Sequence, residues 1–214
     1  MRSRLAGRLS AATLILAVAT GLGGCAQMRI PFLTPASKVA GTVDLIAILP
    51  VDSATAPAGE DNQLDTGAEL AVTAAVYGAL SSSYEWRFVP DLTVADAMQT
   101  ISPLDAATKR AVELGKATKA DAVIFGSVWR FVERKGTADA ADRGASVAFT
   151  LRLVLVSTGE VVWEETFEQT QEGLRSPVLD WVLFWEDAPQ WLTAAELTQV
   201  GVDAMIQNLR RTLD

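Results

Sequence analysis

The chain has 214 residues, with 18 lysines and arginines, 26 aspartates and glutamates and no histidine. The lack of histidine excludes Ser-His-Asp and Cys-His nucleophilic sites and histidine-based zinc sites, so we expect neither catalysis nor a metal or cofactor. The formal net charge of −8 repels phosphate backbones, and we therefore expect no nucleic acid partner.

The first 24 residues have the pattern of a bacterial lipoprotein signal peptide. Three arginines precede an apolar stretch at 9–18, which is shorter than the roughly 20 residues that span a bilayer. Residues 22–25 read LGGC and resemble a lipobox. That resemblance implies a diacylglycerol on the Cys25 sulfur, cleavage before Cys25 and acylation, with palmitate, of the new amino terminus. The alternative is an ordinary secretory signal in which the cysteine is incidental.

After cleavage, residues 25–40 are predicted to form the lipidated amino terminus and a short tether. Pro31 and Pro35 favour extended backbone there. Ala26 resembles the residue that follows the cysteine in outer-membrane lipoproteins, which predicts an outer-membrane anchor facing the periplasm. Residues 41–214 are of a length that suits a single periplasmic domain with one core.

The first part of this domain alternates strands and helices. Apolar runs predict strands at 43–49, 84–89 and 120–132. Capping signals predict one helix that starts with the box Thr66–Glu69 and another that starts at Ser102-Pro103. The expected buried side chains are Val72, Val76, Ala79 and Leu80 in the first helix and Leu104, Ala107, Ala111 and Leu114 in the second. Right-handed crossovers predict parallel pairing of these strands.

The second part is predicted to be an antiparallel meander and a terminal helix. Residues 147–155 and 161–168 alternate between two faces, around a turn that contains Gly159, whereas residues 133–144 are expected to form a mobile loop. The terminal helix begins with the capping box Thr193–Glu196. Its expected buried stripe is Val202, Ile206, Leu209 and Leu213. The predicted fold class is α/β, with a mixed sheet of about five strands (β-α-β-α-β-β-β-α) and flanking helices.

Residues 179–191 (LDWVLFWEDAPQW) are unusually rich in tryptophan. Trp181, Phe184 and Trp185 would share one face of a helix, and Trp191 follows. One interpretation is a short helix that packs its aromatic rings against the sheet. The other is an exposed aromatic anchor for a partner protein, because tryptophan is enriched at binding hot spots.

Two groups of acidic residues have an ordinary and a functional interpretation. The first group is Asp52, Glu60, Asp61 and Asp65, and the second is Glu164, Glu168 and Glu172. The first is either a solvated loop or a calcium site, although its spacing does not match an EF-hand. The second is either an exposed strand face or a carboxylate pair for cleaving a glycan.

Several motifs together resemble a known periplasmic domain. They are Leu49-Pro50-Val51, residues 120–128 (ADAVIFGSV) and residues 158–163 (TGEVVW). In this order, and with a lipobox, they resemble the α/β domain of CsgG-type, FlgO-type, LpoB-type and TolB amino-terminal-type proteins over residues 43–167. The resemblance implies a module without catalytic residues that binds other envelope proteins or assembles into rings. The loop at 133–144 is shorter than a pore hairpin, and the tether is shorter than that of LpoB-type proteins.

The resulting hypothesis is a non-catalytic outer-membrane lipoprotein that acts as an envelope accessory or assembly factor through protein contacts. The first alternative is a ring-forming or multimeric structural subunit, hence a homo-oligomer. The second is a carboxylate-based cell-wall hydrolase, which the missing nucleophile and base sets disfavour.

Overall fold

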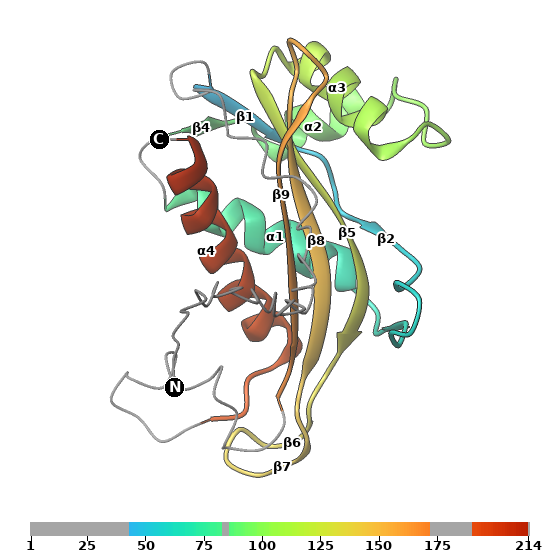
Figure 1. Ribbon diagram of the computed structural model, residues 1–214, viewed down its shortest axis with the longest axis vertical. Helices are drawn as coiled ribbons and strands as arrows, with labels where there is room; N and C mark the ends of the chain where they lie inside the picture. Colours follow the sequence, from blue (N-terminus) through green and yellow to red (C-terminus); the bar gives the residue numbers. More distant parts are fainter. Residues whose placement is uncertain (1–42, 83–85, 172–189, 214) are drawn as a thin grey trace, which may run out of the picture. The chain divides into compact units, whose positions relative to one another are not determined.

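The computed structural model describes residues 43–82, 86–171 and 190–213, which form a mixed sheet with helices on both faces (Figure 1). The elements in chain order are β1 (Leu45–Ile48), β2 (Asp52–Ser53), β3 (Gln63–Leu64), α1 (Ala68–Ser81), β4 (Arg87–Phe88), α2 (Asp91–Met98), α3 (Ala107–Thr118), β5 (Ala122–Val132), β6 (Lys135–Gly136), β7 (Ala141–Arg143), β8 (Ser146–Leu155), β9 (Val161–Thr170) and α4 (Ala194–Leu213). The main strand order is β4-β1-β5-β8-β9, and β2 and β3 also pair with β5. The predicted fold class is confirmed.

The amino-terminal half of the sheet is parallel. Strand β1 lies between β4 and β5 and runs parallel to both, with Ile46 opposite Phe88 on one side and Ala122 on the other. Residues 46–48 of β1 are completely buried. This agrees with the continuous apolar run in the sequence, because a strand with both faces covered has no polar alternation.

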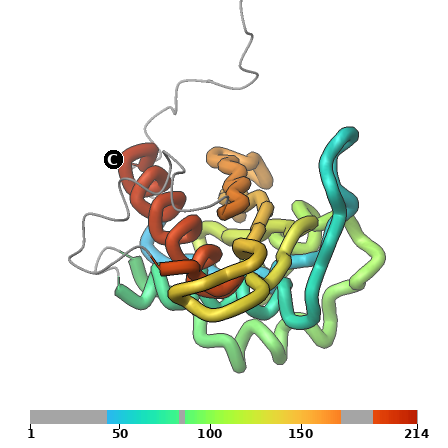
Figure 2. The backbone as a smooth tube through the Cα atoms, turned by 90° about the horizontal axis from the view of Figure 1, so that it is seen from below, coloured from blue at the N-terminus to red at the C-terminus, as the bar shows by residue number. Residues whose placement is uncertain are grey.

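Beyond the end of β1, the chain continues along the same edge of β5 as a segment that we call the strap (residues 52–64). Its two short strands pair with β5 in parallel, and Ala54 N donates to Val128 O at 2.8 Å. Trp129 lies where the register of β5 shifts, and its Nε1 donates to Glu60 Oε2 at 2.7 Å. Figure 2 shows the strap, in cyan, on the side of the described structure away from α4, in red.

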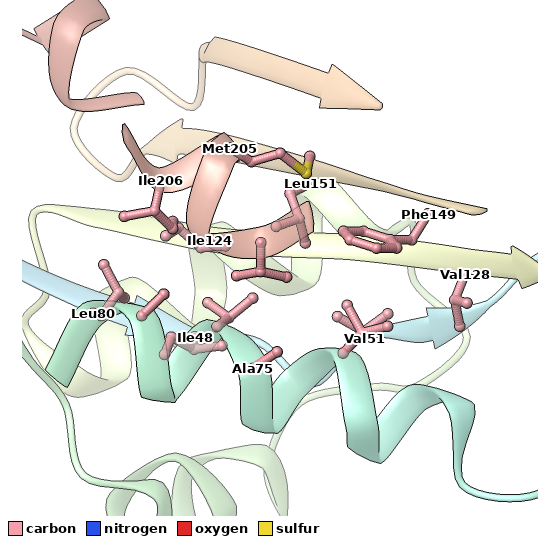
Figure 3. Packing of buried hydrophobic residues seen from close by; sticks show 14 of the residues in the cluster. Ile48, Val51, Ala75, Leu80, Ile124, Val128, Phe149, Leu151, Met205 and Ile206 are labelled. Carbon is pink, nitrogen blue, oxygen red and sulfur yellow. The ribbon is translucent and has the colours of Figure 1, made fainter. Parts of the chain in front are cut away.

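Helices α1 and α4 cover one face of the sheet, and α2 and α3 cover part of the other. Alternate residues of the strands supply the two cores, since neighbouring side chains point to opposite faces. Figure 3 shows the larger core, where Ile48 and Ile124 from the sheet meet Leu80 from α1 and Met205 from α4. The smaller core is built around Ala47, Leu49, Val123, Phe125, Val94 and Leu114.

The predicted meander is also confirmed. Strand β8 pairs antiparallel with β5 and with β9, and Phe149 lies opposite Val128 and Phe167. Gly159 has a φ of 72° in the turn between β8 and β9, as expected for a glycine in this position. A register shift between Leu153 and Val154 adds one residue to β9 near this turn.

Some details differ from the sequence-based expectations. Helix α1 is preceded by Gly67 in a left-handed conformation (φ 90°), so Thr66 does not form the expected capping box. Two helices stand where one was expected, because α3 begins only at Ala107 and α2 precedes it. Leu104 therefore lies outside the helix and is 95% exposed rather than buried. Residues 133–144, expected to be a loop, contain the β6–β7 hairpin.

The capping box of α4 forms as predicted. Thr193 Oγ1 accepts from Glu196 N at 3.1 Å, and Glu196 Oε2 accepts from Thr193 N at 2.7 Å. A second carboxylate, from Glu133, accepts from Ala194 N at 3.2 Å. Both negative charges lie at the positive end of the helix dipole, which stabilises the start of α4.

We expect the contribution of Glu196 to stability to depend on pH. The hydrogen bonds from Thr193 hold the pKa of Glu196 below its ordinary value of 4.5. The ionised form is therefore preferred in the folded state, and its contribution is present above pH 4.5 and is lost as the pH falls through the lower folded value. In urea unfolding, the wild type should have a larger free energy of unfolding than Glu196→Gln at pH 7. This difference should become smaller in acid. A difference in free energy of unfolding that stays constant at every pH would contradict the expected role of the ionised Glu196 side chain.

Candidate functional site

The aspartate of the ADAVIFGSV motif holds the start of β1 through hydrogen bonds. Asp121 Oδ2 accepts from Asp44 N at 3.0 Å and from Leu45 N at 2.9 Å, and Asp121 N donates to Leu45 O at 2.8 Å. Arg87 forms an ion pair with Asp44 next to these bonds. Asp121 thus satisfies backbone donors at an end of β1, and this arrangement is structural.

Replacing Asp121 with alanine should lower the free energy of unfolding by about 1–2 kcal/mol, because two backbone donors lose a charged acceptor. Asp121→Asn retains one carbonyl oxygen of similar geometry and should therefore lower the free energy of unfolding by a smaller amount. Chemical denaturation of both variants at neutral pH measures the difference. Equal stability of the wild type and Asp121→Ala would show that water replaces the carboxylate without cost.

The glycine of the same motif is required by close packing inside the sheet. A Cβ atom on Gly126 would lie 2.3 Å from Thr150 O of the neighbouring strand β8. That separation is too short for any side chain, so β5 and β8 can pair here only through a glycine. The two most distinctive residues of the motif therefore have roles in building the sheet.

Three of the four acidic residues of the strap region, Asp52, Glu60 and Asp65, have separate partners. Asp52 forms an ion pair with Arg110 at 2.8 Å, and Asp65 Oδ2 accepts from Glu133 N at 2.8 Å. Glu60 accepts from the Trp129 indole. Within the described residues, no group of three or more potential metal ligands comes together. The structure therefore does not assemble the calcium site that we considered from the sequence.

The strand carboxylates are also paired with arginines. Glu164 pairs with Arg152 at 2.9 Å, and Glu168 pairs with Arg130 at 2.6 Å. Four residues separate them along β9, a spacing of roughly 13 Å at about 3.3 Å per residue. Glycoside hydrolysis needs two carboxyl groups about 5–9.5 Å apart, so this pair does not have the required geometry. Glu172, the third residue considered, lies outside the described residues.

Of the aromatic residues in the tryptophan-rich segment, only Trp191 lies within the described residues. Trp181, Phe184 and Trp185 lie outside the described residues, as does Cys25. Trp191 is half-buried, and its N donates to Ala138 O at 2.8 Å. Arg134 donates to the Trp191 carbonyl, and a Cβ atom on Gly144 would lie 2.7 Å from Trp191 Cζ3. Trp191 thus packs the entry to α4 against the β6–β7 hairpin.

The groove between α1 and α4 offers little room for a small ligand. A groove of about 240 Å³ lies between α1 and α4, and Ala79, Ser82, Asp203, Ile206, Gln207 and Arg210 line it. Pockets for small molecules and cofactors usually have about 300–1,000 Å³ and apolar walls. This groove is smaller and mostly polar, so it does not indicate a small-molecule site.

The feature that sequence reasoning missed is the free edge of the sheet at β9. The alternation of β9 predicted two faces, but it did not predict that no described strand would pair with its outer side. Residues Glu164, Thr166, Glu168 and Thr170 alternate as exposed positions along it. The only sequence signal was that β9 ends the meander.

These observations define a mixed α/β domain in which Asp52, Glu60, Asp65, Glu164 and Glu168 have partners, and in which no described strand pairs with the outer side of β9. In the described part of the chain, none of the helices has both the length and the apolar character needed to cross a bilayer. A family model described as peptidoglycan-synthase activator LpoB matches residues 61–168, from the strap to β9. The chain belongs to this LpoB family.

Solved structures with low sequence identity are similar to this chain. The PelC dodecamer from Paraburkholderia phytofirmans is 17% identical over 78% of this chain and 88% of that chain, with a TM-score of 0.46. The LpoB C-terminal domain from Escherichia coli is 20% identical over 64% and 93%, with a TM-score of 0.42. Lipoprotein GNA1162 from Neisseria meningitidis is 15% identical over 78% and 99%, with a TM-score of 0.47. No curated protein matches the sequence.

Proposed function

We propose that this protein is a lipid-anchored accessory factor of the bacterial outer membrane that activates a peptidoglycan synthase through protein contacts and performs no catalysis itself. The observation that carries the proposal is the match of residues 61–168 to the family of peptidoglycan-synthase activators. The geometry of Glu164 and Glu168 supports it, because these two strand carboxylates are too far apart along β9 for glycoside hydrolysis and each is paired with an arginine.

The activation is tested with purified components. The full-length protein in detergent, added to a peptidoglycan synthase of the same organism, should raise the rate of glycan polymerisation and should bind the synthase. The Phe149→Ala variant, which we expect to be strongly destabilised, controls for effects of detergent and added protein. An unchanged rate at saturating protein, together with no measurable binding, would remove the proposal.

The anchor is proposed at Cys25, because residues 22–25 match a lipobox behind a basic and apolar leader. Several acyl chains on one residue hold a protein on a membrane far more firmly than a single chain, since each buried methylene contributes about 0.8 kcal/mol. We expect the wild type in the outer-membrane fraction and Cys25→Ser in the soluble periplasmic fraction. Mass spectrometry of the mature amino terminus checks the modification, and an unmodified sulfur would refute it.

For the tryptophan-rich segment, we propose that Trp181, Phe184 and Trp185 bind the partner protein, with packing against the sheet as the alternative. Replacing Trp181 and Trp185 together with alanine separates the two. Weaker binding to the synthase at an unchanged Tm supports the contact. A lower Tm supports packing. The variant Trp191→Ala shows the size of the fall in Tm that loss of a packed tryptophan causes, because Trp191 packs against Gly144.

A further inference from the structure

We propose that the outer edge of β9 binds an extended, lysine- or arginine-bearing segment of the partner, which joins the sheet as an additional strand. This inference rests on the proposed function, because it names the surface and the chemistry of the protein contact. It uses backbone groups of β9 that the fold leaves available, together with the charge of their side chains.

The hydrogen bonds of the meander show which groups of β9 face outward. Gln171 N donates to Ala145 O at 2.9 Å, and the register of β8 and β9 stays constant from there to Trp163. In an antiparallel pair, alternate residues bond to the same neighbour. From Trp163 to Gln169, the odd-numbered residues of β9 therefore bond to β8, whereas beyond the register shift the even-numbered Glu160 accepts from Leu155 N. The N–H and C=O groups of the even-numbered residues point away from the sheet, and these residues are Glu164, Thr166, Glu168 and Thr170.

This edge is accessible and long enough to pair with another chain. The four outward residues are exposed, and no strand within the described residues pairs with this side of β9. Proteins usually protect such an edge with a short strand, a proline, a bulge or a cover. Strand β9 has 10 residues and no proline, and its register shift lies only at the end near Val161. Charged side chains are the remaining protection.

The charges of β9 select against a second copy of this chain. No lysine or arginine occurs from Leu153 to Gln171, whereas Glu160, Glu164, Glu165 and Glu168 lie in this stretch. An antiparallel pair of two β9 strands centred on Thr166 would place Glu164 opposite Glu168 at two positions. Like charges directly opposite each other destabilise strand pairing.

The same charges favour a basic partner. Arg152 approaches Glu164 from within the sheet, and Arg130 approaches Glu168 in the same way. The side chain of Glu164 remains 54% exposed and that of Glu168 remains 44% exposed. A carboxylate has about four lone-pair sites, so each can accept a further bond from a lysine or arginine of an added strand. Backbone hydrogen bonds would supply affinity in this mode of recognition, and alternate side chains would supply specificity.

The test uses a designed peptide as the probe. A labelled nonapeptide that alternates lysine and valine is titrated with the full-length protein in detergent, and binding is followed by fluorescence anisotropy. We expect this peptide to bind and its glutamate counterpart not to bind. A lysine peptide with N-methyl groups on alternate backbone nitrogens keeps its charge but cannot complete the ladder, and it should bind about tenfold or more weakly.

A matched pair of protein variants tests the same edge by changing β9 instead of the peptide. Thr166→Pro removes an outward N–H from β9, and Thr166→Val retains it. Both lose the hydroxyl bond to Thr150, which spans 2.7 Å. We expect Thr166→Val to bind the lysine peptide like the wild type and Thr166→Pro to lose binding. Equal binding of the N-methylated and unmethylated peptides would overturn the inference, even if Thr166→Pro fails to fold, because binding would then rest on charge alone.

The synthase assay separates this inference from the proposed function. Activation lost in Thr166→Pro and retained in Thr166→Val supports the edge as the contact. Equal activation by both variants overturns the edge inference and leaves the proposed function standing. If the wild type binds the lysine peptide through its backbone but never activates a synthase, the edge inference is supported and the proposed function fails. Light scattering that shows β9-dependent dimers, abolished in Thr166→Pro, would overturn the choice of partner.

Discussion

Replacing Phe149 with alanine is expected to lower the free energy of unfolding by about 3–5 kcal/mol. Phe149 is completely buried in the middle strand of the meander. Its ring lies 5.5 Å from that of Phe167, and it faces the core under α1 and α4. Truncation would remove these contacts and leave a cavity that the rigid strands on both sides cannot close. Urea denaturation followed by circular dichroism measures the loss.

Phe88 provides the matched control, because it is also a phenylalanine in an aromatic pair. Its ring lies 6.1 Å from that of Tyr77, but the residue is 36% exposed in the short edge strand β4. Phe88→Ala should cost about 1 kcal/mol, since less apolar area returns to water and no closed cavity forms. Similar losses for the two variants would contradict the assignment of Phe149 to the core.

Gly201→Ala is expected to destabilise the protein by about 1–3 kcal/mol, although alanine is normally the better helix former. Gly201 lies in α4, and an added Cβ would be 2.6 Å from the Phe167 ring. Helix α4 approaches β9 closely only because this position has no side chain. The methyl group would push the helix and the strand apart along their contact. Thermal unfolding should show a lower Tm.

The control is the same substitution in the neighbouring helix. A Cβ on Gly78 in α1 would lie 3.5 Å from the Gln199 side chain, which is an ordinary contact with a flexible group. Gly78→Ala should therefore raise stability by up to about 1 kcal/mol, as in an unhindered helix. The two glycine substitutions should thus have opposite signs. Stabilisation by both would show that α4 shifts away from β9 without cost.

The parts of the fold that could be predicted are those in which side chains repeat with a regular period. The alternation of Val147, Phe149 and Leu151 identified β8, and the box Thr193–Glu196 identified the start of α4. Helix α2 was missed because it has only eight residues, so its inward side chains Val94, Ala97 and Met98 form a single short apolar stripe. The strap was missed because β2 and β3 have only two residues each, which is too short for an alternating pattern to appear in the sequence.

The candidate site was predictable only in part, for a different reason. Asp121 and Gly126 stood out as members of a motif, but their roles depend on the neighbouring strands β1 and β8, which the motif does not specify. The free edge at β9 depends on the order of all the strands. That order is set when β1 inserts between β4 and β5, through contacts between residues about 40–75 positions apart in the sequence.

The position of β1 between two other strands has a mechanical consequence. The chain enters the described structure at Val43 and passes directly into β1, which is hydrogen-bonded on both sides. Tension applied along this strand from the amino-terminal side must break its bonds to β4 and β5 together, rather than peel them one at a time. Resistance to such a pull is governed by the unfolding rate. A body joined to a surface through a strand that is bonded on both sides should therefore withstand shear better than one joined through an edge strand.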